Sequence, residues 1–248
     1  MMETLYITGA GVSAESGIPT FRGTDGFWTI GSINYTPQEI ATRAMYLRHP
    51  DEFLHWYFKR FATYHEIKPN SVHYWLADKT LITQNIDGLD GKAGNKNYIP
   101  IHGRLDKVSL FLEQGIDTPL LDAPWPQVFT ACQNTSDANF IKKTLLDAFK
   151  ISAKTKTPEL GVSLKPFVLL FDEYYTENYR ISEAERWMGE ADHFVFMGTS
   201  FSVNITTIAL RIALSRQSRI EVVDPNPIDI GIPGLIHHRI TAAEYIAV

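Results

Sequence analysis

The sequence predicts an α/β fold, a doubly wound parallel sheet of the Rossmann-like class with a smaller inserted lobe. Short apolar or β-branched runs bounded by turn residues recur along the chain, and such runs are typical of strands covered on both faces. Helical patterns alternate with these runs, which implies right-handed crossovers between parallel strands. The expected strands are 4–8, 80–83, 98–101, 167–171, 193–197 and 220–223.

The helical patterns fill most of the intervals between these strands. Ser182 and Glu185 stand three residues apart and resemble a capping box at a helix start. The expected helices are 36–47, 51–65, 137–149, 182–189 and 205–214.

Two long stretches interrupt the alternation and predict the smaller lobe. Residues 23–77 and 104–165 are too long to be simple loops. We therefore expect one domain, 1–248, whose larger lobe comprises about 1–22, 78–103 and 166–248.

Composition excludes several classes of function. The chain has 248 residues, 44% of them hydrophobic and 21% charged, as in a soluble globular protein. A net charge of -5 gives no basic footprint for nucleic acid, and no apolar run approaches the ~20 residues that span a bilayer. The first expected strand leaves no room for a secretory signal, so we expect a cytoplasmic protein without nucleic-acid or membrane partners.

The single cysteine, Cys132, excludes an internal disulfide. It also excludes a structural zinc site of the usual kind, which needs four Cys or His ligands. No zinc is therefore expected, and packing alone must hold the smaller lobe.

The first expected strand runs into Gly9-Ala10-Gly11 and a helix start. Glycines at such a turn let the backbone approach a pyrophosphate, whose charge faces the free amides of the helix, although a bare G-x-G also occurs in many tight turns. The continuation SGIPTFRG at 16–23 is more specific. It resembles the sirtuins, a family of NAD-dependent protein-lysine deacylases.

The segment TQNIDGL at 83–89 places polar residues where a parallel strand ends, which is where open α/β sheets bind ligands. From the residues alone an Asx turn that ends the strand is the favoured interpretation. The resemblance implies that Asn85 and Asp87 contact nicotinamide, with Asn85 in the catalytic set, and that Gln84 contacts a ribose. The family often has His where Asp90 stands, which we interpret as a peripheral change.

His102 follows another strand, where a histidine is either structural or a general base. The resemblance implies that His102 deprotonates a ribose hydroxyl of NAD. That step follows attack of the acyl oxygen on the anomeric carbon and departure of nicotinamide. The hydroxyl then closes on the imidate, and water releases O-acyl-ADP-ribose and free lysine.

The resemblance also implies further cofactor contacts. Phe21 would shield the anomeric carbon and Arg22 would touch a phosphate or anchor its loop. The family usually has Asn where Asp224 stands, but a carboxylate can still hold the adenine ribose hydroxyls and would disfavour a 2′-phosphate, so NAD is expected over NADP. The remaining expected cofactor residues are Gly9, Ala10, Gly11, Gly198, Thr199 and Ser200.

Tyr57 and Arg60 lie three apart in an expected helix and share a face. From the residues alone an ordinary amphipathic surface is the favoured interpretation. They resemble a pair carried by sirtuins that remove succinyl, malonyl and glutaryl groups, which implies that they bind an acidic acyl chain. Phe171 and Val203 are the implied contacts of an acylated peptide, and Asp172 replaces a family glycine at that edge.

We therefore expect a zinc-free, sirtuin-like enzyme that uses NAD to deacylate lysines of proteins or peptides. One alternative is an NAD hydrolase or ADP-ribosyltransferase, which the altered residue Asp172 leaves open. Another is a non-catalytic nucleotide-binding module, but His102 beside Asn85 and Asp87 favours catalysis because binding alone needs no base.

Overall fold

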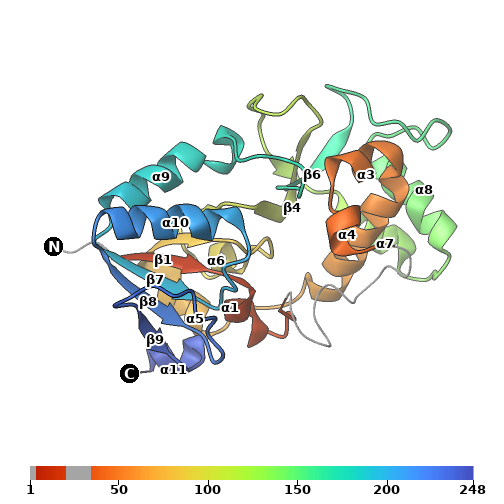
Figure 1. Ribbon diagram of the computed structural model, residues 1–248. Helices are drawn as coiled ribbons and strands as arrows, with labels where there is room; N and C mark the ends of the chain where they lie inside the picture. The colour runs from red at the N-terminus through yellow and green to blue at the C-terminus, as the bar shows by residue number, and fades with distance from the viewer. Residues whose placement is uncertain (1–3, 21–34, 248) are drawn as a thin grey trace. The chain divides into compact units, whose positions relative to one another are not determined.

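The computed structural model describes residues 4–20 and 35–247, which divide into two compact units. The first unit comprises Met1–Phe21, Ile67–His102 and Tyr179–Val248. The second comprises Arg22–Glu66 and Gly103–Asn178. Figure 1 shows a parallel sheet between helices in the first unit, and helices beside a small sheet in the second.

The first unit is built on a six-stranded parallel sheet of order β3-β2-β1-β7-β8-β9, which confirms the predicted fold class. Its strands are β1 (Thr4–Thr8), β2 (Thr80–Thr83), β3 (Tyr98–Pro100), β7 (His193–Met197), β8 (Arg219–Val223) and β9 (Ile236–His238). Its helices are α1 (Ala10–Ala14), α5 (Ser71–Trp75), α6 (Leu89–Lys92), α9 (Ile181–Glu190), α10 (Asn204–Ser215) and α11 (Ala242–Ile246). A 3-10 turn, η1 (Leu76–Asp78), follows α5, and a second, η2 (Glu177–Tyr179), spans the boundary between the two units.

Helices cover both faces of this sheet. On one face Val72 of α5 and Ala242 of α11 join a core with Leu81, Val195 and Val223 from the strands. Figure 1 shows α9 and α10 over the opposite face. Burial on both faces explains why the strands are continuously apolar.

One buried carboxylate ties the edge of the sheet together. Glu221 of β8 is 3% exposed and accepts hydrogen bonds from His193 of β7 (3.0 Å), His238 of β9 (2.8 Å) and Tyr245 of α11 (3.1 Å). Burial acts to raise the pKa of Glu221, but the hydrogen bonds from His238 and Tyr245 outweigh it and lower that pKa. The ionised carboxylate therefore holds the three-residue edge strand β9 and helix α11 on the sheet.

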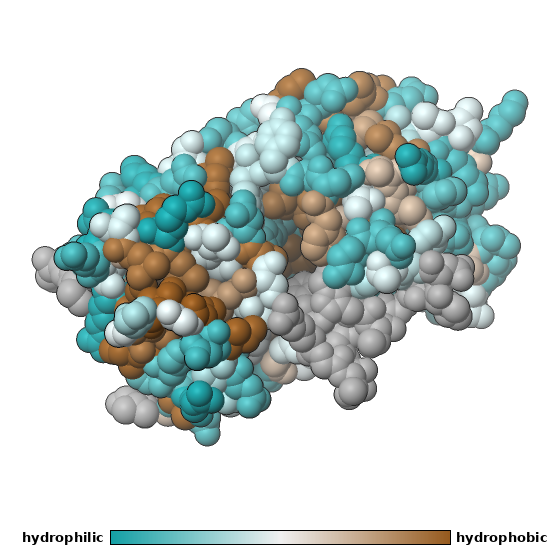
Figure 2. Space-filling model, viewed as in Figure 1, coloured by the Kyte–Doolittle hydropathy of each residue, from teal (hydrophilic) through white to brown (hydrophobic). Residues whose placement is uncertain are grey.

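An apolar area lies on the surface of the first unit. Figure 2 shows it over the region of β8 and the segment that joins β8 to β9. Ile228 and Ile236 of this region are exposed large hydrophobic residues. None of the helices in the described ranges has the length and apolar character needed to cross a membrane.

The second unit has an antiparallel sheet of order β5-β4-β6 and a group of helices. The strands are β4 (Gly103–Leu110), β5 (Leu121–Asp122) and β6 (Leu164–Val168). The helices are α2 (Pro37–Ile40), α3 (Arg43–Arg48), α4 (Pro50–Tyr64), α7 (Trp125–Cys132) and α8 (Ala138–Ala148).

Aromatic packing around Trp125 forms the core of the second unit. This fully buried ring lies 4.6 Å from Phe149, 6.1 Å from Phe61 and 6.4 Å from Phe58, between ring centroids, and its indole donates to the carbonyl of Leu105 (2.7 Å). Aromatic pairs of this kind add about 0.5–1.5 kcal/mol each beyond the area they bury. These contacts join α4, α7 and the end of α8 to strand β4.

The second unit does not fit the zinc site that the family often carries. The sequence has one cysteine, Cys132, and it is buried in α7. Among the described residues, no group of three or more His, Cys, Asp or Glu side chains is arranged to hold a metal ion. A four-ligand zinc site cannot be assembled from such a set.

Three sequence expectations need correction. The expected helix 36–47 is two helices, because Thr36 caps α2 and Thr42 caps α3 through the amide of Met45 (3.0 Å). The expected capping box at Ser182 is wrong, since α9 begins at Ile181 after Arg180, whose φ of 57° stops the preceding turn.

The expected parallel strand 167–171 is also wrong. Strand β6, Leu164–Val168, pairs antiparallel with β4 in the second unit. All five of its residues are buried, so its apolar run looks like that of a central parallel strand.

Two segments fall in a different unit from the one expected. Residues 67–77 lie in the first unit because α5 packs on the parallel sheet, and 166–178 lie in the second because β6 pairs with β4.

The turn after β1 packs directly against the turn after β7. The amide of Gly9 donates to Met197 (3.0 Å) and that of Gly11 donates to Gly198 (3.0 Å). A Cβ placed on Gly11 would lie 2.6 Å from the Cα of Gly198, which itself has a φ of 58°. Glycine is therefore required here for the approach of two backbones.

We expect Gly11→Ala to lower the free energy of unfolding by about 1–3 kcal/mol, because the added methyl meets backbone that cannot rotate away. Urea denaturation of the purified variant measures this. Gly189→Ala is the matched control, since Gly189 lies in α9 with nothing within 4 Å of its added Cβ. Equal stability of the Gly11 variant and the wild type would contradict the packing argument.

Candidate active site

The carboxyl ends of β1, β2 and β7 bring polar side chains together in the first unit. The Gln84 amide donates to the carbonyl of Thr8 (3.1 Å) and to the Thr199 hydroxyl (3.1 Å). Thr199 follows β7 and is 6% exposed. Two residues predicted from separate motifs, Gln84 and Thr199, are thus hydrogen-bonded neighbours.

Asn85 and Asp87 are linked through Ser13 of α1. The Asn85 amide donates to the carbonyl of Gly9 (3.0 Å) and to the Ser13 hydroxyl (3.1 Å). That hydroxyl donates to the Asp87 carboxylate (2.7 Å), which also accepts from the amide of Leu89 (2.9 Å). The amide and the carboxylate are held in fixed orientations at one edge of the sheet.

His102 lies just beyond β3 and is half-buried. Its Nδ1 lies 3.0 Å from the carbonyl of Gln84. Since that oxygen can only accept, Nδ1 carries the hydrogen and Nε2 is the nitrogen able to take up a proton. Burial lowers the pKa of His102 to about 4, although the hydrogen bond to Gln84 opposes this, so the ring is neutral at pH 7.

The remaining predicted residues of the first unit lie at neighbouring strand ends. The hydroxyls of Ser200 and Ser202 are 2.9 Å apart, and Val203 precedes helix α10. Asp224 follows β8, and one of its oxygens accepts from the amide of Asn226 (2.8 Å) in an Asx turn. Gly9, Ala10 and Gly11 form the β1–α1 turn already described, whereas Phe21 and Arg22 lie outside the described residues.

Tyr57 and Arg60 lie on α4 in the second unit and are not the exposed surface pair that their spacing also allowed. They are 4% and 1% exposed. The Arg60 guanidinium lies over the Trp56 ring, 3.2 Å from its centroid, and donates to the Trp56 carbonyl (2.8 Å). Burial lowers the pKa of Arg60 to about 9, against the opposing effects of Tyr57 and Tyr64.

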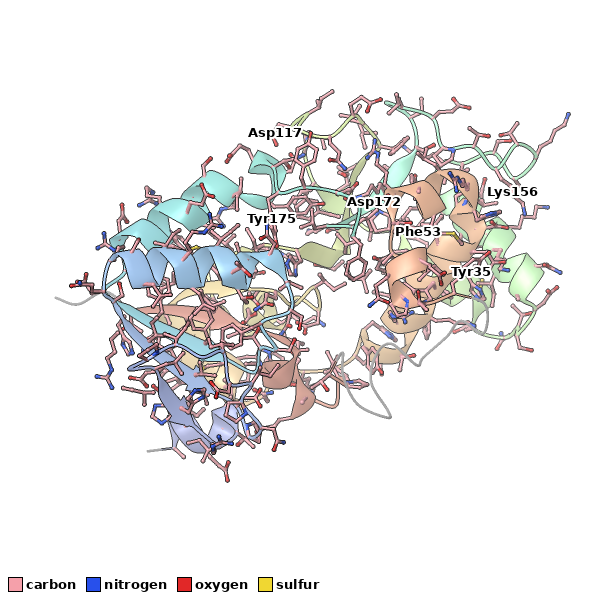
Figure 3. All side chains as sticks on the ribbon, viewed as in Figure 1. Tyr35, Phe53, Asp117, Lys156, Asp172 and Tyr175 are labelled. Carbon is pink, nitrogen blue, oxygen red and sulfur yellow. The ribbon has the colours of Figure 1, made fainter. Side chains whose placement is uncertain are left out.

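The segment 171–173 is anchored within the second unit. Phe171 is 53% exposed, and its amide donates to the carbonyl of Ala41 (3.0 Å). The Asp172 carboxylate accepts from the first amides of α3, those of Arg43 (2.6 Å) and Ala44 (3.0 Å), and Figure 3 shows Asp172 beside this helix. A carboxylate at a helix N-terminus is stabilised by the helix dipole, so Asp172 has a structural function in addition to any effect on substrates.

The sequence interpretation missed Ser13 and undervalued Asp90. Ser13 lies one turn after Gly9, and no local pattern distinguishes it from other helix-start serines. Asp90 was interpreted as peripheral, which is wrong, since it is 3% exposed. Asp90 is the second residue of the short helix α6 and comes three residues after Asp87, and this closeness of two acids in the sequence was the available signal.

The family model of the Sir2 family matches residues 9–205, which contain most of these side chains. The chain belongs to the Sir2 family. The predicted resemblance to sirtuins is thereby confirmed.

Curated sirtuins are similar to this chain over most of their length. The "NAD-dependent protein deacylase" of Bacteroides thetaiotaomicron is 30% identical, over 96% of this chain and 91% of that protein. The "NAD-dependent protein deacylase 1" of Archaeoglobus fulgidus is 32% identical, over 89% of this chain and 80% of that protein.

Solved sirtuin structures share the fold. A Sir2 homologue–NAD complex aligns with a TM-score of 0.71 at 28% identity, covering 99% of this chain and 87% of that one. A mutant Sir2 homologue in complex with 2′-O-acetyl ADP-ribose aligns with a TM-score of 0.71 at 27% identity, covering 98% and 88%.

We expect Ser13→Ala to lower NAD consumption with an acyl-lysine peptide by roughly ten- to a hundredfold, because it removes one neutral and one charge-assisted hydrogen bond. Steady-state kinetics measure this. Ser16→Ala is the matched control, since the buried Ser16 hydroxyl oxygen has no hydrogen-bond partner within 4–20 and 35–247. Equal losses in both variants would show that Ser13 does not act through Asn85 and Asp87.

Proposed function

We propose that this sirtuin removes acyl groups from lysines of proteins or peptides, consuming NAD and preferring succinyl and malonyl groups over acetyl. The first part follows from its class: a Sir2-family chain whose relatives over nearly its whole length are named NAD-dependent protein deacylases is an enzyme of that kind. The acyl preference and the residue roles are the new elements.

The state of His102 is the single observation that best supports the chemistry. A general base must be unprotonated at working pH and must present one nitrogen to its proton donor. The Gln84 carbonyl fixes the tautomer, and the pKa near 4 keeps the ring neutral. We assign His102 the removal of a proton from an NAD ribose hydroxyl once nicotinamide has left.

The other assignments follow from donor and acceptor chemistry. Asn85 supplies an amide and Asp87 a carboxylate, which together suit the carboxamide of nicotinamide. Gln84 and Thr199 supply amide and hydroxyl groups for ribose. The other groups assigned to NAD are Gly9, Ala10, Gly11, Phe21, Arg22, Gly198, Ser200 and Asp224.

Tyr57 and Arg60 support the acidic acyl preference. A guanidinium withdrawn from water loses hydration, and its lowered pKa records that cost. A dicarboxylic acyl group would present a carboxylate to this cation, and the Tyr57 hydroxyl lies close enough to affect the same pKa. Arginine binds carboxylates through two parallel hydrogen bonds, which acetyl cannot accept in the same way.

The peptide edge is assigned to Phe171 and Val203. Phe171 is exposed, and the next residue, Asp172, is anchored by the first amides of α3 within the second unit. This anchoring accounts for Asp172 without invoking the hydrolase alternative.

Mass spectrometry of matched acetyl- and succinyl-lysine peptides, with and without NAD, tests the proposal. We expect NAD-dependent loss of succinyl faster than of acetyl, with O-acyl-ADP-ribose formed, and neither reaction in His102→Ala. Conversion of NAD to nicotinamide and ADP-ribose with both peptides intact would favour an NAD hydrolase instead. Full activity of His102→Ala would contradict the assignment of His102 as the general base.

We expect Arg60→Met to lower kcat/KM for the succinyl peptide roughly ten- to a hundredfold while that for the acetyl peptide changes little, since a hydrogen bond to a charged group contributes about 1.5–3 kcal/mol. The matched control is Lys59→Met, which removes an exposed cation from the adjacent position of the same helix.

Because Arg60 is buried, its loss can also unfold the second unit. Tyr57→Phe keeps the ring and removes only the hydroxyl, so it separates recognition from folding. Retention of the succinyl preference in both Arg60→Met and Tyr57→Phe, with thermal stability unchanged, would overturn the assignment.

A further inference from the structure

Asp90 is a buried acid whose surroundings suit a protonated carboxyl group. It lies on α6, is 3% exposed, and accepts a hydrogen bond from the Thr83 hydroxyl. Its Oδ1 is buried and has no hydrogen-bond partner in the described part of the chain. An ionised carboxylate has about four acceptor sites to satisfy, so one with an unpartnered oxygen is costly to bury.

A second acid lies beside it. Asp87 accepts from the Ser13 hydroxyl (2.7 Å) and the Leu89 amide (2.9 Å), as an ionised carboxylate does. Burial, and then the negative charge of Asp87, raise the pKa of Asp90 to about 7. When two carboxyl groups share a site, one keeps its proton, and the hydrogen bonds indicate that it is Asp90.

The elements packed against α6 carry the other titratable or charged groups of this region. They are His73 on α5, Asp78 on η1, Tyr98 on β3 and, on α6 itself, Lys92. Burial lowers the pKa of His73, whose Nε2 lies 3.5 Å from the Ser13 hydroxyl, and the hydrogen bond from Lys79 lowers the pKa of Asp78. Asp90 is the acid in this set that ionises near neutrality.

Thr83 connects Asp90 to the predicted nicotinamide contacts. Its hydroxyl oxygen accepts from the amide of Asn85 (3.2 Å) and the hydroxyl of Thr8 (2.9 Å) while it donates to Asp90. Asn85 in turn reaches Asp87 through Ser13. These interactions connect Asp90 to the site in two ways. The Thr83 hydroxyl hydrogen-bonds both Asp90 and the backbone amide of Asn85, and the charge of Asp87 acts on Asp90 electrostatically.

We propose that Asp90 is a positioning residue for nicotinamide: its protonated form lets Asp87 and Asn85 keep their arrangement, and its ionisation weakens nicotinamide binding. The second negative charge repels Asp87, which Ser13 links to the Asn85 amide. This inference rests on the proposed roles of Asn85 and Asp87.

Calorimetric titration of the full-length protein with nicotinamide at pH 6, 7 and 8.5 tests the inference. We expect the wild type to lose affinity about tenfold from pH 6 to 8.5, equivalent to a change of one pKa unit on binding. Asp90→Asn has nearly the same shape and no titrating group, and it should keep one affinity throughout. Asp78→Asn is the matched control, because it removes an exposed acid from the adjacent turn, and it should follow the wild type.

A pH-independent affinity in the wild type, or the same pH dependence in Asp90→Asn, would overturn the proposal. Absence of deacylation in the mass-spectrometric assay would instead count against the proposed function, since nicotinamide binding does not require turnover.

Carboxyl carbon NMR of protein labelled at aspartate gives a direct second readout. The resonance that disappears in Asp90→Asn should titrate with a midpoint near 7, and a midpoint below 5 would overturn the proposal.

The pH dependence of thermal stability also reports the protonation state of Asp90, because folding and proton binding are linked. The folded state binds this proton more tightly than the unfolded chain, so the wild type loses stability relative to Asp90→Asn as the pH rises from about 4 to 7. We expect the Tm difference to grow over that interval and stay constant above it. A difference independent of pH would contradict a protonated Asp90.

Discussion

The contact between the backbones at Gly11 and Gly198 is the constraint on which the arrangement of the first unit depends. It brings the turn after β1 against the turn after β7, so two strand ends meet without side chains between them. Gln84 and Thr199 are within hydrogen-bonding distance because these turns are so close. Ser13 follows on the same short helix, where it meets Asn85 and Asp87. The absence of a Cβ at these glycines is therefore needed first for the contact between the two turns.

The sequence predicted the parts of the fold that depend on local composition. Apolar runs gave five of the six parallel strands, and their polar ends gave Gln84, Asn85 and His102, but the short strand β9 was missed because Ile-His-His is not an apolar run. The sequence could not assign β6 to the correct sheet. All five of its residues are buried, and a strand of a central parallel sheet has the same apolar composition. Only the pairing partner, β4, distinguishes the two, and that partner lies more than fifty residues away.

In the candidate active site, too, local sequence predicted some properties and tertiary structure determined the others. Residues carried by motifs were predicted, but the electrostatic state of each was not. Asp90 and Asp87 are the same residue type three positions apart, yet one accepts hydrogen bonds as an anion and the other is pushed toward neutrality. Arg60 was likewise predicted by spacing, whereas its placement against Trp56 depends on how α4 packs. Burial is a tertiary property, so the pKa of a side chain cannot be inferred from its neighbours in sequence.

The aromatic core of the second unit has a consequence for durability. A lobe clamped by metal–thiolate bonds fails when a chelator removes the metal or an oxidant attacks the sulfur. Here the sequence offers one thiol, and Cys132 is enclosed in α7. The rings packed around Trp125 hold the lobe without a metal or a thiolate ligand. Their contribution to the stability of the second unit comes from apolar burial, which weakens on cooling. This unit is therefore expected to be more sensitive to cold than to oxidation.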